Sequence, residues 1–152
     1  MNRAPSRPAV TPSTGSFPRA ARVRKRPEFL RIQALGRRVP TRSFVLLLYA
    51  REPHGARLGV TVSRRVGNAV VRNRMKRLVR EAFRATRRLF ADDLDLVVIV
   101  RRAGPEASLW SVLDEWEGVE AEIARQSERA RRDREDRARL AQAGKTGDSS
   151  VR

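Results

Sequence analysis

The feature that most constrains this chain is one stretch, residues 68–90, in which apolar and basic residues repeat with the period of an α-helix. The apolar side chains fall within one arc of such a helix, and the basic side chains occupy the other side. Asn68 suits the N-cap position, so the pattern predicts a helix that begins there and runs to about Phe90. The apolar arc must be covered by another element of the fold. The apolar arc consists of Val71, Met75, Leu78, Val79, Ala82 and Phe83.

The opposite face of this helix is strongly cationic. From Arg72 to Arg88 the stretch has eight basic residues and one acid, Glu81. Like charges four residues apart, such as Arg72 and Lys76, destabilise a helix, so a chain without an anionic partner would normally intersperse acids. The 152-residue chain has a formal net charge of +17, which also indicates a polyanionic partner. Nucleic acid is the first expectation and an anionic membrane surface is the second.

Composition excludes several other classes of protein. The chain has no cysteine, which excludes a disulfide framework and a cysteine-ligated zinc site. Its longest apolar runs, residues 44–50 and 94–100 (the latter interrupted by Asp95), are far shorter than the roughly 20 residues of a membrane-spanning helix. The N-terminal residues lack the apolar segment of a secretory signal, and we expect a cytoplasmic protein.

The two apolar runs predict strands. Residues 44–50 are apolar on both faces, so this strand should be covered on both sides or form the floor of a groove. Residues 94–100 contain unbroken β-branched residues and predict a central strand. Residues 57–63 alternate, which predicts an antiparallel partner for residues 44–50 across a turn at residues 52–55. Leu58, Val60 and Val62 should point inward.

Two further helices complete the expected fold. Residues 28–35 form a short helix with Pro27 in its first turn, and Gly36 ends it. A last helix should begin at residues 104–105 and carry an apolar stripe that includes Trp116. Strands separated by a helix and followed by another helix predict an α+β domain of roughly 100 residues, with one sheet and helices packed on it.

The chain divides into a domain and two charged tails. Residues 1–22 are basic, without acids and poor in apolar surface, which predicts a disordered N-terminal tail. An acid-poor segment of this kind also suits an organelle transit peptide, although it lacks an amphipathic pattern. Residues 23–124 form the domain. Residues 125–152 are expected to be a charged extension that is helical at first and disordered from about residue 143.

The sequence contains no catalytic constellation. His54 is the only histidine and lies in the predicted turn, without a serine or cysteine nucleophile beside it in sequence. Asp92, Asp93 and Asp95 could suggest a metal site, but a helix stop and a strand edge explain them better. We therefore predict no catalytic residue and no metal ligand in the protein itself.

The surroundings of the cationic helix favour RNA over DNA. A helix-turn-helix reader requires a preceding helix and a tight turn, whereas a predicted strand precedes this helix. A sheet with cationic and aromatic groups nearby is more typical of modules that hold single-stranded RNA. Phe29, Phe44 and Tyr49 are the aromatic residues near the predicted sheet, and each can be a core residue instead of a stacking platform.

Residues 64–83, Arg-Arg-Val-Gly-Asn-Ala-Val-Val-Arg-Asn-Arg-Met-Lys-Arg-Leu-Val-Arg-Glu-Ala-Phe, closely resemble the signature of the bacterial ribonuclease P protein subunit. That signature is an Arg-Asn-Arg helix after a Gly-Asn-Ala-Val turn. The resemblance covers about residues 23–122 and includes residues 24–29, Gly36, residues 42–44 and residues 57–63.

The resemblance implies a fold and a function. The fold would be a small two-layer α/β sandwich with a mixed sheet and a left-handed βαβ crossover, similar to ribosomal protein S5 domain 2. The protein would bind the catalytic ribonuclease P RNA and the single-stranded 5′ leader of precursor tRNA. The RNA, with Mg²⁺ that it mainly holds itself, would remove the leader to give the mature tRNA 5′ end. No membrane partner and no obligate protein partner are implied.

The resemblance also carries residue roles. The leader cleft would include Phe29, Val45 and Thr61. Gln33 and Leu47 stand where relatives can have aromatic residues, and Tyr49, on the same strand face as Leu47, could compensate. Arg72 and Lys76 would lie near the leader as well as the catalytic RNA. The residues expected to bind RNA are Arg64, Arg65, Asn68, Arg72, Asn73, Arg74, Lys76, Arg77, Arg80 and Arg84.

Two other classes of protein remain open on charge and size alone. A structural RNA-binding protein, such as a ribosomal protein, fits both equally well, and only the signature stretch separates it from the ribonuclease P subunit. A DNA-binding protein or a nucleic-acid chaperone is the third class. Its non-specific binding would fall with salt according to the number of phosphates neutralised.

Overall fold

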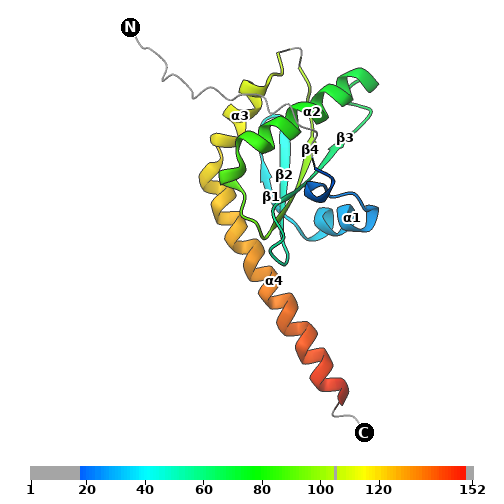
Figure 1. Ribbon diagram of the computed structural model, residues 1–152, viewed down its shortest axis with the longest axis vertical. Coiled ribbons are helices and arrows are strands. Elements are labelled where there is room, and N and C mark those ends of the chain that lie inside the picture. The colour runs from blue at the N-terminus through cyan, green and yellow to red at the C-terminus, as the bar shows by residue number, and fades with distance from the viewer. Residues whose placement is uncertain (1–17, 105, 150–152) are drawn as a thin grey trace.

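The computed structural model of the protein describes residues 18–104 and 106–149. Its elements form one sheet with a helical layer on one face and a short helix on the other (Figure 1). In chain order they are η1 (Arg19–Ala21), α1 (Arg26–Leu35), β1 (Arg37–Pro40), β2 (Phe44–Ala50), β3 (Arg57–Val62), α2 (Ala69–Ala85), η2 (Arg87–Leu89), β4 (Leu94–Val100), α3 (Leu109–Glu117) and α4 (Glu120–Ser149).

The sheet is mixed, with strand order β1-β2-β4-β3. β2 pairs antiparallel with β1 and with β4, whereas β3 pairs parallel with β4. The predicted antiparallel pairing of β3 with β2 is therefore wrong, because β4 lies between them. Both central strands are apolar on both faces, apart from Asp95 in β4, and need cover on both sides, whereas the alternating β3 suits an edge. β1 was not predicted; it is a short edge strand whose Pro40 is tolerated there.

The connection from β3 through α2 to β4 is a left-handed crossover, as the sequence resemblance implied. In Figure 1, α2 lies in front of the sheet, and the chain passes from β3 to β4 on its left. Nearly all parallel strand connections have the opposite hand. This topology places α2 across the sheet, with its N-terminal turn close to the end of β3.

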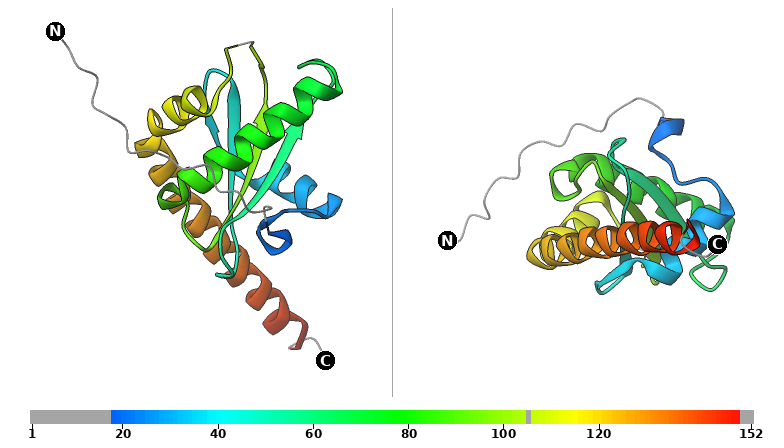
Figure 2. Two further views of the ribbon diagram at one scale, coloured as in Figure 1. Left: turned by 45° about the horizontal axis from the view of Figure 1, so that its top comes forward. Right: turned by 90° about the horizontal axis from the view of Figure 1, so that it is seen from below.

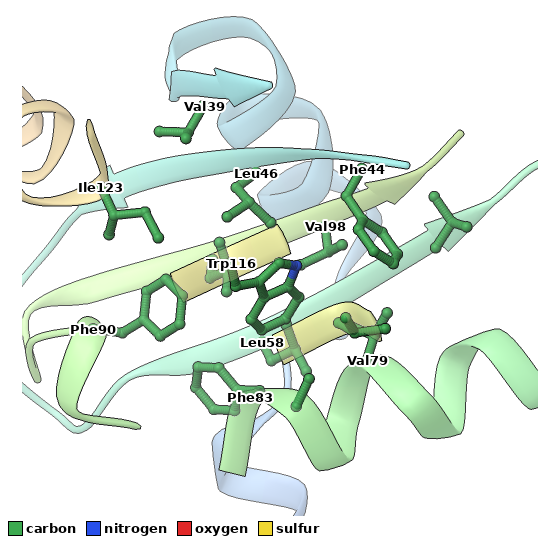
Figure 3. Close-up of a cluster of buried hydrophobic side chains, with 14 of the residues drawn as sticks. Val39, Phe44, Leu46, Leu58, Val79, Phe83, Phe90, Val98, Trp116 and Ile123 are labelled. Atoms are coloured by element: carbon green, nitrogen blue, oxygen red, sulfur yellow. The ribbon is translucent and has the colours of Figure 1, made fainter. Parts of the chain in front are cut away.

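The main core lies between the sheet and the helices α2 and α3. Trp116 is fully buried at its centre, with edge-on contacts to Phe44 and Phe90 at ring-centroid distances of 6.2 and 6.0 Å (Figure 3). The predicted apolar arc of α2 faces this core: Met75, Val79, Ala82 and Phe83 are buried, and Val71 and Leu78 pack at its margin. A smaller core on the opposite face packs α1 against β2 and β4.

The ends of α2 are set by local hydrogen bonds. The side-chain oxygen of Asn68 accepts from the backbone N–H of Val71 at 3.0 Å, which confirms the predicted N-cap. The helix ends at Ala85 rather than near Phe90. The hydroxyl of Thr86 donates to the carbonyl of Ala82 at 2.6 Å, and a 3₁₀ turn follows that directs Phe90 into the core.

Three expectations about the chain ends need correction. The last helix is two helices: Ser108 begins α3 with a reciprocal cap to Ser111, and Gly118 ends it. α4 then continues to Ser149, past the expected onset of disorder, because its sequence is rich in the helix formers Ala, Arg, Gln and Glu. At the other end, residues 18–22 are ordered through η1 and a bridge from Arg22 to Leu58. The remainder of the predicted N-terminal tail lies outside the described residues.

Ion pairs fasten α4 to the sheet. Arg131 donates to Asp93 through Nε at 2.9 Å, and Arg37 forms a two-bond pair with Asp133 at 2.8 Å for both bonds. These arginines lower the pKa of both aspartates, chiefly through hydrogen bonds to the carboxylates. After Ala130 the described side chains of α4 contribute no buried apolar residue, so charge holds this part of the helix.

We expect the ion pairs that hold α4 against the sheet to weaken in acid. Because the folded-state pKa of Asp93 and Asp133 lies below the unfolded value, their stabilisation is present above about pH 4 and is lost as the pH falls further. Urea unfolding between pH 6 and pH 3 measures the loss. Asp133→Asn should be less stable than the parent at pH 6 and should lose less stability on acidification. Parallel pH profiles for the two chains would contradict this role of Asp133.

Candidate nucleic-acid interface

The basic face of α2 runs along the outside of the sheet-and-helix core. Asn73, Arg74 and Arg77 are exposed, whereas Arg72, Lys76, Arg80 and Arg84 are half-buried. The buried Nε of Arg72 has no hydrogen-bond partner within the described chain. The exposed Arg64 and Arg65 precede the helix in the turn that follows β3. The predicted cationic residues are thus all at least partly exposed on α2 or in the turn before it.

Two of the predicted residues also have structural roles. The side-chain oxygen of Asn68 is occupied by the helix cap, which leaves its amide nitrogen for other partners. Arg74 donates through Nη2 to the carbonyl of Ala107 at 2.5 Å and so links α2 to the segment before α3. The cap role of Asn68 was predicted from the sequence, whereas the contact of Arg74 with Ala107 was not evident from the sequence pattern.

Arg80 lies where positive charges crowd together. Its pKa is lowered, first by burial and then by repulsion from Arg22 and Arg84. Arg22 comes from the segment before α1, which the bridge to Leu58 holds beside β3. Sequence reasoning assigned Arg22 to a disordered tail and missed it, because only the tertiary pairing brings this segment to α2. Such a cluster is stabilised by an anion that takes up the excess charge.

A groove of about 500 Å³ separates α1 from β3 and the near edge of α2. Three predicted cleft residues, Phe29, Gln33 and Thr61, line it, and Lys76 of the basic face closes one side. Leu30 also lines the groove, and its side chain is 51% exposed. The groove therefore combines apolar and cationic walls.

Gly59 fixes the depth of this groove. A Cβ atom at this position would lie 2.7 Å from two ring carbons of Phe29, so only glycine lets the ring settle against β3. Phe29 also packs on the buried residues of the smaller core. Its ring is half-buried, and one part of it faces the groove.

The other three cleft residues are placed elsewhere. Val45 and Leu47 are 3% and 1% exposed in the smaller core, so they support the groove from below and do not line it. Tyr49 lines a separate hollow beside α4, and the guanidinium of Arg137 lies 4.4 Å from its ring centroid. A helix beyond the predicted domain thus covers the ring that was expected to compensate for Leu47.

The acidic residues near β4 are used within the protein. Asp95 is 2% exposed and accepts from Arg51 at 2.6 Å and from Arg57 at 2.7 and 2.9 Å. Asp93 pairs with Arg131, and Asp92 is exposed in the turn before β4. Among the described residues, no group of three or more His, Cys, Asp or Glu is arranged to hold a metal ion. Over the same part of the chain, no helix is long and apolar enough to cross a membrane.

The fold and this surface define a class: a small, strongly basic α+β domain with a left-handed crossover and a cationic helix beside a groove. A family model described as Ribonuclease P matches residues 17–123. The chain belongs to the ribonuclease P protein family, as its signature stretch predicted. The family implies a ribonuclease ribonucleoprotein with an RNA partner and a role in tRNA processing.

Individual relatives agree with this assignment. The ribonuclease P protein component of Desulforapulum autotrophicum is 44% identical over 87 residues, 57% of this chain and 74% of that protein. The component from Geobacter sp. (strain M21) is 45% identical over 78 residues, 51% of this chain and 67% of that protein.

Solved structures of the family share the fold, which confirms the predicted α+β class. The RNase P protein of Staphylococcus aureus matches with a TM-score of 0.59 and 32% identity, covering 68% of this chain and 94% of that chain. The RNase P protein of Thermotoga maritima matches with a TM-score of 0.56 and 30% identity, covering 64% and 93%. The family match ends at residue 123, so nearly all of α4 lies beyond it.

Proposed function

We propose that this chain is the protein subunit of a cytoplasmic ribonuclease P and binds two RNAs at once. The basic face of α2, with Arg64 and Arg65, binds the catalytic RNA. The groove beside α1 binds the single-stranded 5′ leader of precursor tRNA. One observation carries the proposal: Lys76 belongs to both surfaces, so the groove opens directly onto the basic face.

The two surfaces suit different parts of the task. Arginine presents a planar fork of donors that matches phosphate oxygens, which suits a helix lying along a folded RNA. The groove offers the edge of Phe29 and the stem of Leu30 to unpaired bases, and Arg24, Arg26 and Lys76 to the backbone. Its walls suit a single strand better than a duplex, because a duplex cannot expose base faces to them.

We assign bond cleavage to the RNA and to Mg²⁺ that the RNA holds. Endonucleolytic removal of the leader requires an activated water and stabilisation of the leaving oxygen, which bound metal ions supply. The protein positions the leader and adds positive charge beside the catalytic RNA, where it offsets phosphate repulsion. Asp93 and Asp95 are engaged by arginines, and His54 lies exposed in a turn, which supports a positioning role for this chain.

The test is a cleavage assay with precursor tRNA, the cognate catalytic RNA and the purified chain. We expect no cleavage by the chain alone. We expect the RNA with the chain to cleave at lower Mg²⁺ than the RNA by itself, because protein cations replace part of the Mg²⁺ screening. Cleavage by the chain alone in low salt would contradict the assignment of catalysis. Recovery of ribosomal RNA in place of one catalytic RNA with the chain would favour a structural ribosomal role.

A further inference from the structure

The groove beside α1 is not isolated. A second hollow of about 220 Å³ adjoins it at the N-terminal turn of α1, and Arg24 lines both. A third hollow of about 450 Å³ adjoins the second, and Glu28 and Arg57 line both of these. The three hollows form a row that passes around the start of α1 and ends at α4.

The second hollow is built by the segment before α1. Val23 is buried, and its backbone N–H donates to the carbonyl of Leu58 at 3.0 Å, which fixes this segment beside β3. The neighbouring Arg24 and Lys25 are exposed and line this hollow. Arg24 and Lys25 therefore belong to a segment whose backbone is held in place by hydrogen bonding to β3.

The third hollow lies between α1, the turn after β2 and the middle of α4. Figure 2 shows the β2–β3 turn lying against α4. Arg134 donates through Nη2 to Glu52 at 2.6 Å, and Arg137 donates to the carbonyl of Ala50 at 3.1 Å. The guanidinium of Arg137 also covers the ring of Tyr49. These contacts hold both arginines at the hollow.

The acidic groups along this row do not neutralise it. The buried carboxylate of Asp95 forms ion pairs with Arg51 and Arg57. A carboxylate oxygen of Glu28 lies 3.5 Å from Nη1 of Arg57. Arg31 is exposed, Arg134 pairs with Glu52, and Arg137 contacts a ring and a carbonyl and lies within electrostatic range of Asp133. The basic residues that line the second and third hollows still outnumber these acids. Six residues of the row define what we call the basic track: Arg24, Lys25, Arg31, Arg57, Arg134 and Arg137.

We propose that single-stranded RNA leaving the groove follows the basic track around α1, and that α4 holds its far end. The ligand is the upstream part of the leader, so this inference rests on the proposed function. Arginine forks suit its phosphates, and the stacked pair of Arg137 and Tyr49 offers a planar cation to a base. Arg134 and Arg137 of α4 lie past the end of the family match, so this contact extends the leader site by a segment outside the matched region.

The experiment measures how leader length affects the binding of precursor tRNA to the holoenzyme. Substrates with leaders of about 4 and about 16 nucleotides fill the groove alone or the groove and the track. For the parent chain we expect the longer leader to bind about 10-fold more tightly. Arg134→Gln with Arg137→Gln should remove most of that gain and leave the short-leader affinity unchanged.

Two matched variants control for charge and folding. Arg129→Gln with Arg132→Gln removes the same charge from exposed positions of α4 that line none of the three hollows, and it should keep the gain. Arg31→Gln removes one track charge without touching a contact of α4, and it should reduce the gain even if the double variant at Arg134 and Arg137 loosens the helix.

The outcomes separate the two proposals. A chain that fails to improve binding of the short-leader substrate would overturn the proposed function. Normal short-leader binding with an undiminished gain in the variants at Arg134, Arg137 and Arg31 would overturn the track alone. Equal losses for both leaders would show that these arginines contact the catalytic RNA, which also overturns the assignment of the track to the leader.

Discussion

Replacing Asp95 by alanine is expected to lower the free energy of unfolding by about 3–5 kcal/mol, because it removes the buried partner of two arginines. Asp95 lies on the central strand β4, and its side chain is 3% exposed. The side chains of Arg51 and Arg57, which are 15% and 22% exposed, donate to it from either side. Without the carboxylate, two like charges would face each other at the edge of the core.

Urea unfolding followed by circular dichroism measures this loss, with Asp92→Ala as the matched control. Asp92 is exposed in the turn before β4, so its replacement should change stability by less than about 0.5 kcal/mol. Asp95→Asn keeps an acceptor oxygen but not the charge, and it should fall between the two. Equal stability of Asp95→Ala and Asp92→Ala would show that the arginines find other partners or water.

The elements that sequence pattern predicted well are those whose burial is decided locally. The amphipathic period of α2 and the apolar runs of β2 and β4, the latter interrupted by Asp95, identify these elements and their buried faces. Asn68 adds a capping signal that depends on the backbone of the next three residues only. In each case one segment contains all the information that its secondary structure requires.

The features that the sequence did not predict depend on contacts between distant segments. β3 alternates in the same way whether it pairs with β2 or with β4, and only the crossover through α2 decides which. β1 begins with Arg37 and Arg38, which give no apolar alternation, and Arg37 is ordered by Asp133 from α4. The apolar stripe of α3 continues to Ile123 with the same helical period. The stripe therefore gave no sign that the helix ends at Gly118 and that α4 begins after it.

The same distinction between local pattern and distant contacts applies to the candidate site. The cationic face of α2 could be predicted because exposure on a helix follows from position alone. The groove could be predicted only in part: Phe29, Gln33 and Thr61 line it, but Val45 and Leu47 lie beneath α1. Arg22 and Arg137 could not be assigned, because each reaches its neighbours through a segment outside the predicted domain.

Replacing Arg72 or Arg80 by alanine is expected to weaken binding of the catalytic RNA by about 1–3 kcal/mol for each residue, by analogy with charge-assisted hydrogen bonds. This corresponds to a roughly 5- to 150-fold rise in Kd. Arg72 is half-buried on α2, and its buried Nε has no partner within the described chain. Filter binding or fluorescence anisotropy at fixed salt measures the change.

Arg80 makes this prediction discriminating, because binding and stability should respond differently. Its alanine variant removes a charge that Arg22 and Arg84 repel, so the free energy of unfolding should fall by no more than about 0.5 kcal/mol while RNA affinity drops. The slope of log K against log salt should also become less negative, by about 0.7–0.9 for each phosphate that the variant no longer neutralises.

Arg88→Ala is the matched control: Arg88 belongs to the same basic stretch, but it lies past the end of α2 and near Glu117, at 3.8 Å. An equal loss of affinity for Arg88→Ala and Arg80→Ala would mean that RNA responds to net charge and not to the face of α2.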